Sequence, residues 1–132
     1  MSQIIVDEQL DPEEVLEPIR QWTTAQWLPK LRPGEIIKDD RVPQLLRELR
    51  QPTFVTIDAG FWNKKLCDNK YCILYFDLRT KQQALLPRML RELLRLPEFR
   101  TKAARTGKVA RVRFSRIDYW QLHDEQQMQI NW

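Results

Sequence analysis

Residues 54–62 constrain the fold more than any other stretch of this chain: they read Phe54-Val55-Thr56-Ile57-Asp58-Ala59-Gly60-Phe61-Trp62. The aromatic and β-branched residues favour a buried strand, and Gly60 suits a sharp exit from that strand. In an open α/β sheet, ligands bind in the crevice outside the carboxyl ends of the strands. Asp58 follows this strand directly and is therefore the first candidate site residue.

The same design, an apolar run followed by an acid, occurs twice more. Ile4 to Val6 is followed by Asp7 and Glu8, and Cys72 to Phe76 is followed by Asp77. Short runs that are apolar throughout are typical of parallel strands covered on both faces. The sequence therefore predicts three buried strands, each of which delivers a carboxylate at its end.

Three segments have the apolar spacing of helices, namely residues 11–22, 39–49 and 86–95. Asp11 is a predicted N-cap, and Pro18 predicts a kink or a restart within the first helix. Asp39 or Asp40 is predicted to cap the second helix, which would explain either residue without a functional role. Residues 23–28 are a weaker candidate strand, because their alternation is poor.

Strands that alternate with helices predict an α/β fold with a mainly parallel sheet. Residues 108–116 alternate between apolar and polar side chains, which predicts a strand with one solvated face. A chain of 132 residues is expected to form a single domain. Its three glycines cannot build a P-loop or a dinucleotide-binding fingerprint, which excludes nucleotide-dependent chemistry through either motif.

Composition narrows the class of protein further. No apolar run is long enough to span a membrane and no signal peptide is visible, so we expect a cytoplasmic protein that does not enter membranes. The spacing of Cys67 and Cys72 matches no zinc motif, and the only histidine, His123, lies far away in the sequence. The cysteines are expected to serve packing.

The charge is unevenly divided. Residues 1–66 contain 9 Lys and Arg against 11 Asp and Glu, whereas residues 67–132 contain 13 against 7. A basic half suits contact with a polyanion, although it also suits a solubilising surface. The candidate nucleic-acid contacts are Arg88, Arg91, Arg95, Arg111 and Arg113. For the helical members of this set, a solvated helix face is the commoner explanation of such a stripe than a binding surface.

Neighbouring parallel strands place their carboxyl ends about 5 Å apart, so Asp7, Asp58 and Asp77 are expected to converge. Carboxylates that lie this close repel one another unless a cation sits among them. Ligands that are all oxygen favour Mg²⁺ or Mn²⁺ over zinc. Such an ion orients a phosphodiester and helps to generate the attacking hydroxide.

Three motifs, in this order and spacing, make the chain resemble PIN-like nuclease domains, particularly the compact bacterial group associated with toxin–antitoxin systems. The motifs are Ile4-Ile5-Val6-Asp7-Glu8 with Leu10 and Pro12, Asp39-Asp40 before Leu45-Leu46, and Val55-Thr56-Ile57-Asp58-Ala59-Gly60-Phe61. The resemblance covers about residues 3–115. It implies a three-layer PIN-like fold, with residues 117–132 as a C-terminal extension of a single domain spanning residues 1–132.

The resemblance also implies roles for the acids. Asp7, Asp40 and Asp58 would be the catalytic metal ligands, and Glu8 would act beside the first of them. Gly60 departs from the related pattern, which commonly has an acid at this position. Asn63 or Asp77 would then substitute for the missing carboxylate.

Two functions follow from the resemblance. The first is a metal-dependent endoribonuclease that acts on RNA, of the kind that serves as a toxin and is held by an antitoxin protein. The second is a PIN-like binding module without catalytic activity, which the missing acid at Gly60 favours. Separately, the alternation of Met128, Ile130 and Trp132 with polar residues predicts an edge strand. That strand would pair with a second copy of the chain as a homodimer, or fold back on its own sheet.

Overall fold

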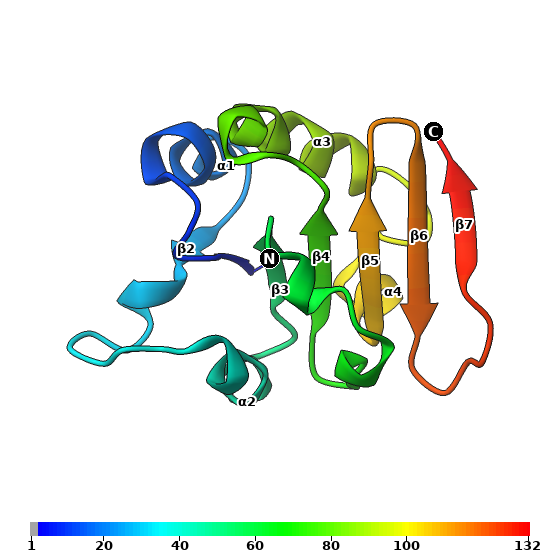
Figure 1. Cartoon of the computed structure of the whole chain (residues 1–132), viewed down its shortest axis with the longest axis horizontal. Helices are drawn as coiled ribbons and strands as arrows, with labels where there is room; N and C mark the ends of the chain where they lie inside the picture. The colour runs from blue at the N-terminus through cyan, green and yellow to red at the C-terminus, as the bar shows by residue number, and fades with distance from the viewer. Residues whose placement is uncertain (1–2) are drawn as a thin grey trace.

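The structure, a computed structural model, describes residues 3–132, which form one seven-stranded sheet with helices packed against it. Figure 1 shows the strands from left to right in the order β2 (Ala25–Trp27), β1 (Ile4–Val6), β3 (Thr53–Thr56), β4 (Cys72–Phe76), β5 (Lys108–Val112), β6 (Arg116–Gln121) and β7 (Met128–Asn131). Strands β2, β1, β3, β4 and β5 are parallel, and β6 and β7 continue the sheet in antiparallel pairing. The prediction of an α/β fold with a mainly parallel sheet is confirmed.

The helical elements of residues 3–132 are short. They comprise α1 (Glu17–Arg20), α2 (Val42–Arg47), α3 (Leu86–Leu93) and α4 (Lys102–Arg105), and the tighter or wider turns η1 (Pro12–Leu16), η2 (Leu28–Lys30), η3 (Asp39–Arg41), η4 (Ala59–Phe61), η5 (Lys64–Leu66) and η6 (Thr80–Leu85). None of the helices in this part of the chain has the length and hydropathy that crossing a membrane requires.

The three apolar runs form the strands β1, β3 and β4, and every residue of these strands is buried. Ile4 pairs with Thr53, and Thr53 pairs in turn with Cys72, so the three strands lie side by side. Alternate side chains of a strand point to opposite faces of the sheet, and both faces are covered here, which is why β1 and β4 are apolar throughout and β3 has only threonines besides its apolar residues.

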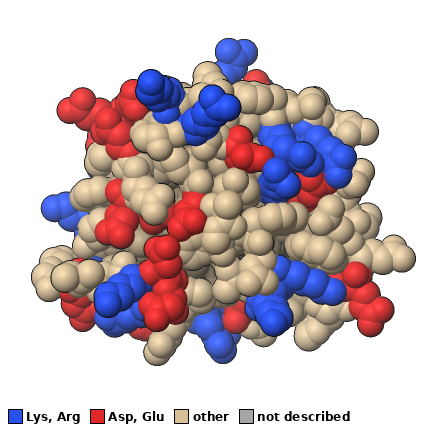
Figure 2. Space-filling model, viewed as in Figure 1, with Lys and Arg blue, Asp and Glu red and all other residues tan. Residues whose placement is uncertain are grey.

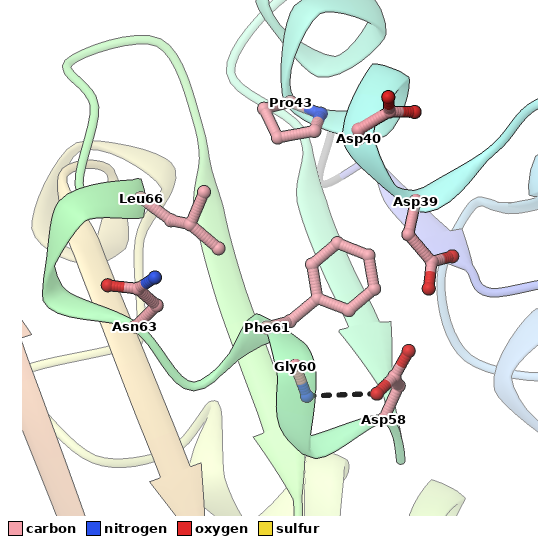
Figure 3. A pocket seen from close by; sticks show the side chains of 8 residues that line it. All are labelled: Asp39, Asp40, Pro43, Asp58, Gly60, Phe61, Asn63 and Leu66. Carbon is pink, nitrogen blue, oxygen red and sulfur yellow. Dashed lines mark hydrogen bonds between the residues drawn. The ribbon is translucent and has the colours of Figure 1, made fainter.

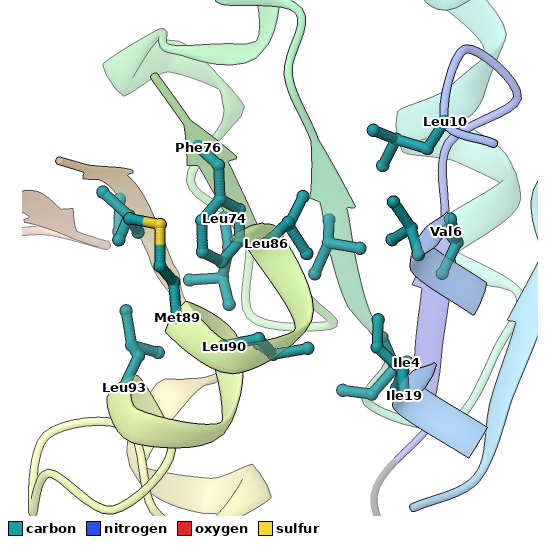
Figure 4. Packing of buried hydrophobic residues seen from close by; sticks show 14 of the residues in the cluster. Ile4, Val6, Leu10, Ile19, Leu74, Phe76, Leu86, Met89, Leu90 and Leu93 are labelled. Atoms are coloured by element: carbon teal, nitrogen blue, oxygen red, sulfur yellow. The ribbon is translucent and has the colours of Figure 1, made fainter. Parts of the chain in front are cut away.

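One face of the sheet packs against α1 and α3. Figure 4 shows Val6 and Leu74 from the sheet and Ile19, Leu86 and Leu90 from the helices gathered in this cluster. The apolar residues of α3 recur at helical spacing, so the helix buries one side and leaves its arginines on the other. This packing fixes the helix over the middle of the sheet.

The opposite face packs against α2 and η4. Ile5, Phe54 and Ile73 point to this face, where they meet apolar residues such as Leu46 and Phe61. The rings of Phe54 and Phe61 pack edge to face with centroids 5.1 Å apart, within the favoured range for aromatic pairs. The loop after β3 is thereby held against the sheet.

Several expectations about individual segments need correction. Residues 11–22 begin with the predicted cap at Asp11 and restart near Pro18 as predicted, but the first piece is the wide turn η1 and only the second, α1, is an α-helix. Neither Asp39 nor Asp40 caps a helix: the N-cap of η3 is Lys38 and that of α2 is Arg41, neither with a side-chain cap bond. These acids therefore have no capping role.

The predicted strand at residues 108–116 is shorter than expected. Strand β5 ends at Val112, and residues 113–115 form the turn into β6, with Phe114 60% exposed. Lys108 and Val109 are buried together with the apolar residues of the strand, so the solvated face is confined to Arg111. The alternation in the sequence included the turn, whose polar residues extended the apparent pattern.

The C-terminal tail folds back onto the sheet. Ile130 of β7 pairs with Ile117 of β6, and the indole Nε1 of Trp132 donates a hydrogen bond of 2.9 Å to the carbonyl of Arg113. The weaker candidate strand at residues 23–28 is also present as β2, at the other edge of the sheet. The two edges of the sheet are therefore formed by β7, which its alternation predicted, and by β2, which was the weakest candidate strand.

Candidate functional site

The crevice between the carboxyl ends of β1 and β3 lies where the order of the strands reverses. The chain leaves β1 for β2 on one side, and it continues from β3 to β4 on the other. In open α/β sheets this reversal point is the usual place for ligand binding. Asp7 follows β1 and Asp58 follows β3 at this position, and the turn η3 brings Asp39 to the same place.

Asp7, directly after β1, is only 1% exposed and does not line the pocket itself. Its Oδ1 accepts a hydrogen bond of 2.8 Å from the backbone N–H of Glu8, and its Oδ2 accepts one of 2.6 Å from the hydroxyl of Thr56. Burial raises the pKa of Asp7 to about 6, although both hydrogen bonds lower it, and the charges of Asp39 and Asp58 raise it slightly further. The carboxylate is thus held in one orientation at an energetic cost.

Thr56 connects the two strand-end acids. Its hydroxyl donates to Asp7, and the same oxygen accepts a hydrogen bond of 3.0 Å from the backbone N–H of Asp58. Thr56 was not among the site residues predicted from the sequence. The signal was present, since a hydroxyl at the last position of β3 is the nearest side chain that can satisfy an acid at the end of the neighbouring strand.

Asp58 is the N-cap of η4. Its Oδ1 accepts a hydrogen bond of 2.9 Å from the backbone N–H of Gly60, shown as the dashed line in Figure 3. Asp58 therefore also begins a short helical turn. The cap bond fixes one carboxylate oxygen, and the carboxylate lines the crevice.

Gly60 is the glycine that makes this arrangement fit. A Cβ atom at Gly60 would lie 3.2 Å from Asp58 Oδ1, closer than side chains normally approach. Gly60 does not have the positive φ of Gly34 and Gly107, so its value here is close approach and not a special turn. The acid that the related pattern places at this position would compete with the cap bond of Asp58.

Asp39 faces Asp58 across the crevice. In Figure 3 the carboxylate of Asp39 points toward Asp58, whereas that of Asp40 points away. The pKa of Asp39 is raised by partial burial first, then by a hydrogen bond and charge repulsion from Asp58, with Glu8 and Asp40 adding repulsion. Asp40, the site residue predicted from the sequence, also lines the pocket, but the carboxylate that interacts with Asp58 is that of its neighbour Asp39.

The crevice opens into a pocket of about 260 Å³ between α2 and the loop after β3. Its polar side includes Asp39, Asp58 and Asn63, and its apolar side is formed by Pro43, Phe61 and Leu66 (Figure 3). The side chain of Asn63 accepts a hydrogen bond of 2.9 Å from the backbone N–H of Lys65 and caps η5. The pocket therefore combines carboxylates with a flat apolar wall.

Asp77 does not join this group. Its Oδ2 accepts a hydrogen bond of 2.7 Å from Arg111, and its Oδ1 accepts one of 3.2 Å from the hydroxyl of Tyr75. The hydrogen bond from Arg111 is the main cause of the lowered pKa of Asp77. The carboxylate of Asp77 is therefore already neutralised by an arginine.

The ligands that the crevice offers a divalent cation are carboxylate oxygens. Among residues 3–132, no group of three His, Cys, Asp or Glu side chains is arranged to hold a metal ion. Mg²⁺, however, keeps several waters and is usually held by one or two carboxylates together with substrate phosphates. Asp39 and Asp58 supply that pair, and their mutual repulsion is what a cation would relieve. The donor set fits Mg²⁺ or Mn²⁺ in this partly hydrated mode.

Comparison of the chain with protein-family models, curated proteins and solved structures gave no match. The likeness to PIN-like nucleases thus rests on the sequence motifs.

The candidate RNA-binding arginines fall into two groups. Arg88, Arg91 and Arg95 belong to α3 and the residues after it, on the face of the sheet opposite to α2 and the pocket. The guanidinium of Arg91 lies over the ring of Trp22, 5.7 Å from its centroid. The side chain of Arg88 is 87% exposed and lies 3.5 Å from Glu92. These arginines remain available to solvent.

Arg111 and Arg113 lie at the carboxyl end of β5 and are held by acids. Arg111 pairs with Asp77, while Arg113 and Arg116 both pair with Asp118, whose side chain is 3% exposed. Figure 2 shows acidic side chains gathered at the left and centre of the face that Figure 1 presents, with basic side chains in separate groups around them. None of the five candidate arginines lines the pocket.

Proposed function

We propose that this chain is a metal-dependent endoribonuclease with a three-layer PIN-like fold. The observation that carries the proposal is the meeting of Asp39 and Asp58 over the buried Asp7, at the point where the strand order reverses. Mg²⁺ or Mn²⁺ held by Asp39 and Asp58 would polarise a phosphodiester and lower the pKa of an attacking water. RNA is the proposed substrate.

The residues of the chain would orient this chemistry. The cap bond from Gly60 holds one oxygen of Asp58, and Thr56 with the N–H of Glu8 holds both oxygens of Asp7. Asp7 acts as a positioning residue, because its buried charge adds negative potential beneath the crevice without reaching the substrate. The wall of Pro43, Phe61 and Leu66 offers an apolar surface for a nucleobase beside the reacting phosphate.

The basic groups would bind the strand on either side. An RNA that reaches both the pocket and α3 must pass over the carboxyl edge of the sheet, because the two lie on opposite faces. Its phosphates would then meet Arg88 before Arg95, since Arg88 lies near the start of α3. The role as a toxin, with an antitoxin protein as partner, rests on the sequence resemblance and is tested by a small reading frame adjacent to the gene.

Thermal unfolding with and without metal tests the proposal. Mg²⁺ or Mn²⁺ at about 100 times its Kd should stabilise the parent by about 2.7 kcal/mol through linkage. Asp39→Asn and Asp58→Asn should lose this gain and lose cleavage of a single-stranded RNA, while Asp124→Asn, in an exposed loop, keeps both. If Asp40→Asn loses the response and Asp39→Asn keeps it, the assignment from the resemblance is right and ours is wrong.

The second candidate function is a PIN-like binding module without catalysis. Gly60 in place of an acid favours it, as does the absence of a three-residue ligand group among the described residues. For such a module, RNA should bind equally with chelator or metal, and no cleavage should occur. A parent protein whose melting temperature ignores both cations, and which leaves RNA intact, would support the module and remove the nuclease.

A further inference from the structure

The outer edge of β7 lacks the features by which sheet edges normally avoid pairing. Residues 126–132 read Gln126-Gln127-Met128-Gln129-Ile130-Asn131-Trp132, with no charged residue and no proline, in a chain that is 30% charged. Natural edge strands are usually protected by lysine, proline, a bulge or a covering loop. No other strand of residues 3–132 pairs with this edge. The edge is therefore open to a further strand.

The hydrogen bonds of β7 show which backbone groups are free. The N–H of Trp132 donates a bond of 3.2 Å to the carbonyl of Ser115, in register with the pairing of Ile130 and Ile117. In an antiparallel pair, successive residues direct their backbone groups alternately toward and away from the partner strand. Met128, Ile130 and Trp132 thus bond to β6. Gln129 and Asn131 direct their N–H and C=O groups outward.

The side chains at this edge are also unevenly covered. Ile130 and Trp132 pack against the cluster that includes α3, and Met128 points to the same face two residues earlier. Met128 is 46% exposed, so the apolar face of β7 is not closed at that end. The opposite face of the strand carries Gln129 and Asn131, which are amides.

We infer that β7 pairs in antiparallel fashion with β7 of a second copy of this chain, which joins two sheets into one. In the register that matches the outward groups, Gln129 lies opposite Gln129 of the second copy, and the two exchange both backbone hydrogen bonds. Met128 then lies opposite Ile130 of the second copy on the apolar face. Amides of Gln127 and Asn131 are paired on the other face.

A second copy fits this edge better than other strands for two reasons. The strand is self-complementary in this register, since apolar residues meet apolar residues and no like charges are brought together. Pairing of like edges about a two-fold axis also closes after two chains, whereas pairing of β7 with β2 of another copy would continue without end. The inference does not depend on the proposed nuclease activity.

The test uses the full chain and three substitutions at the centre of the interface. Gln129→Pro removes an outward N–H and leaves the bonds to β6 intact, while Gln129→Lys places two ammonium groups opposite each other. Gln129→Thr keeps the strand preference without charge and serves as the matched control. Light scattering after gel filtration should give a dimer mass for the parent and Gln129→Thr, and half that mass for the other two.

Each result decides the question. Monomeric Gln129→Lys with the circular dichroism spectrum of the parent supports the interface, even if Gln129→Pro fails to fold. A parent that stays monomeric at several hundred micromolar overturns it. A Gln129→Lys variant that remains dimeric also overturns it, because the dimer then uses another surface. Open-ended oligomers of the parent would contradict the two-fold arrangement.

Discussion

Thr56 orients the two strand-end acids of the candidate site without itself being a proposed metal ligand. Its hydroxyl donates a hydrogen bond to Asp7 and accepts one from the backbone N–H of Asp58, so the positions of the two acids are linked through one side chain. A valine at this position would fill the same volume and leave a buried carboxylate oxygen without its donor. Such an unmet acceptor costs about 1–3 kcal/mol.

The buried carboxyl of Asp7 predicts a specific dependence of stability on pH. Its pKa is raised from 3.8 to about 6, so the folded state binds the proton more tightly than the unfolded state. This contribution is full below pH 3.8 and is lost as the pH rises through about 6. The difference between these pKa values corresponds to about 3 kcal/mol.

Urea unfolding of the parent and Asp7→Asn between pH 4 and pH 7 measures this effect. The free energy of unfolding of the parent, relative to that of Asp7→Asn, should fall by about 2.4 kcal/mol between pH 4 and pH 7. Glu125→Gln, in an exposed loop, controls for the removal of any carboxylate. Parallel profiles for parent and Asp7→Asn would show that Asp7 titrates normally in the folded chain.

The choice between Asp39 and Asp40 marks the limit of sequence reasoning at this scale. Consecutive residues in a helical turn point in directions roughly 100–120° apart, so only one of two neighbouring acids can face a given point. Which one does so depends on where the turn begins, and η3 begins after Lys38 with no capping side chain to mark it. Asp7 and Asp58 could be identified from the sequence because each follows the end of a buried strand.

Among the elements, α4 is tied to the sheet by a buried arginine. Arg105 is 1% exposed, and its Nε donates a hydrogen bond of 2.6 Å to the hydroxyl of Thr53 at the start of β3. Its Nη1 donates to the carbonyls of Phe99 and Arg100, at 3.1 and 3.5 Å. Burial lowers the pKa of Arg105. This side chain therefore joins the loop after α3 to the central strands.

Arg105→Ala should lower the free energy of unfolding by about 3 kcal/mol, because it opens a cavity and leaves these acceptors unpaired. Thr53→Val, which removes one acceptor and keeps the volume, should cost about 1–2 kcal/mol. The matched control is Arg100→Ala, since that side chain is exposed on the same loop and should change stability by less than about 0.5 kcal/mol. Equal effects of Arg105→Ala and Arg100→Ala in urea unfolding would argue against the anchoring role.

Helix α3 carries the arginines that can reach phosphates without breaking an ion pair of the sheet. Reversing Arg88 and Arg95 to Glu should weaken binding of single-stranded RNA. The slope of the logarithm of the binding constant against log salt should become shallower by about 1.4, because each lost phosphate contact removes about 0.7. The melting temperature should not change. Reversal of Arg50 and Arg100, both exposed, controls for net charge. An unaltered salt slope in the first variant would assign the α3 arginines to a solvated face.

The strands could be predicted where both faces of the sheet are covered, because burial there restricts the residues mostly to apolar ones. Strands β1, β3 and β4 are apolar at every position or nearly so, and they were identified with their terminal acids. Strand β2 was a weaker candidate because its residues follow no strict period, and β5 was predicted too long because the alternation continues into the turn after Val112. The division of residues 12–20 into η1 and α1 falls where Pro18 predicted a restart, whereas the wide form of the turn η1 was not predicted.

At the scale of the whole molecule, the crevice and the open edge lie well apart in the sheet. The crevice is between β1 and β3, and three further strands separate β3 from β7 (Figure 1). Two chains joined through β7 would therefore leave both crevices open to solvent. Gln129→Lys should bind Mg²⁺ or Mn²⁺ as the parent does for each chain, which separates assembly from metal binding.

The number of residues between paired strands differs greatly between the two halves of the sheet. Val112 pairs with Ile117 across a short turn, whereas Ile4 pairs with Thr53 across more than a third of the chain. Local pairings close small loops at little entropic cost and tend to form early. In refolding with pulsed hydrogen exchange, we expect amides of β5, β6 and β7 to be protected before those of β1 and β3; the reverse order would contradict this. The carboxylates would then be brought together late, so their repulsion slows the final step of folding and not the first.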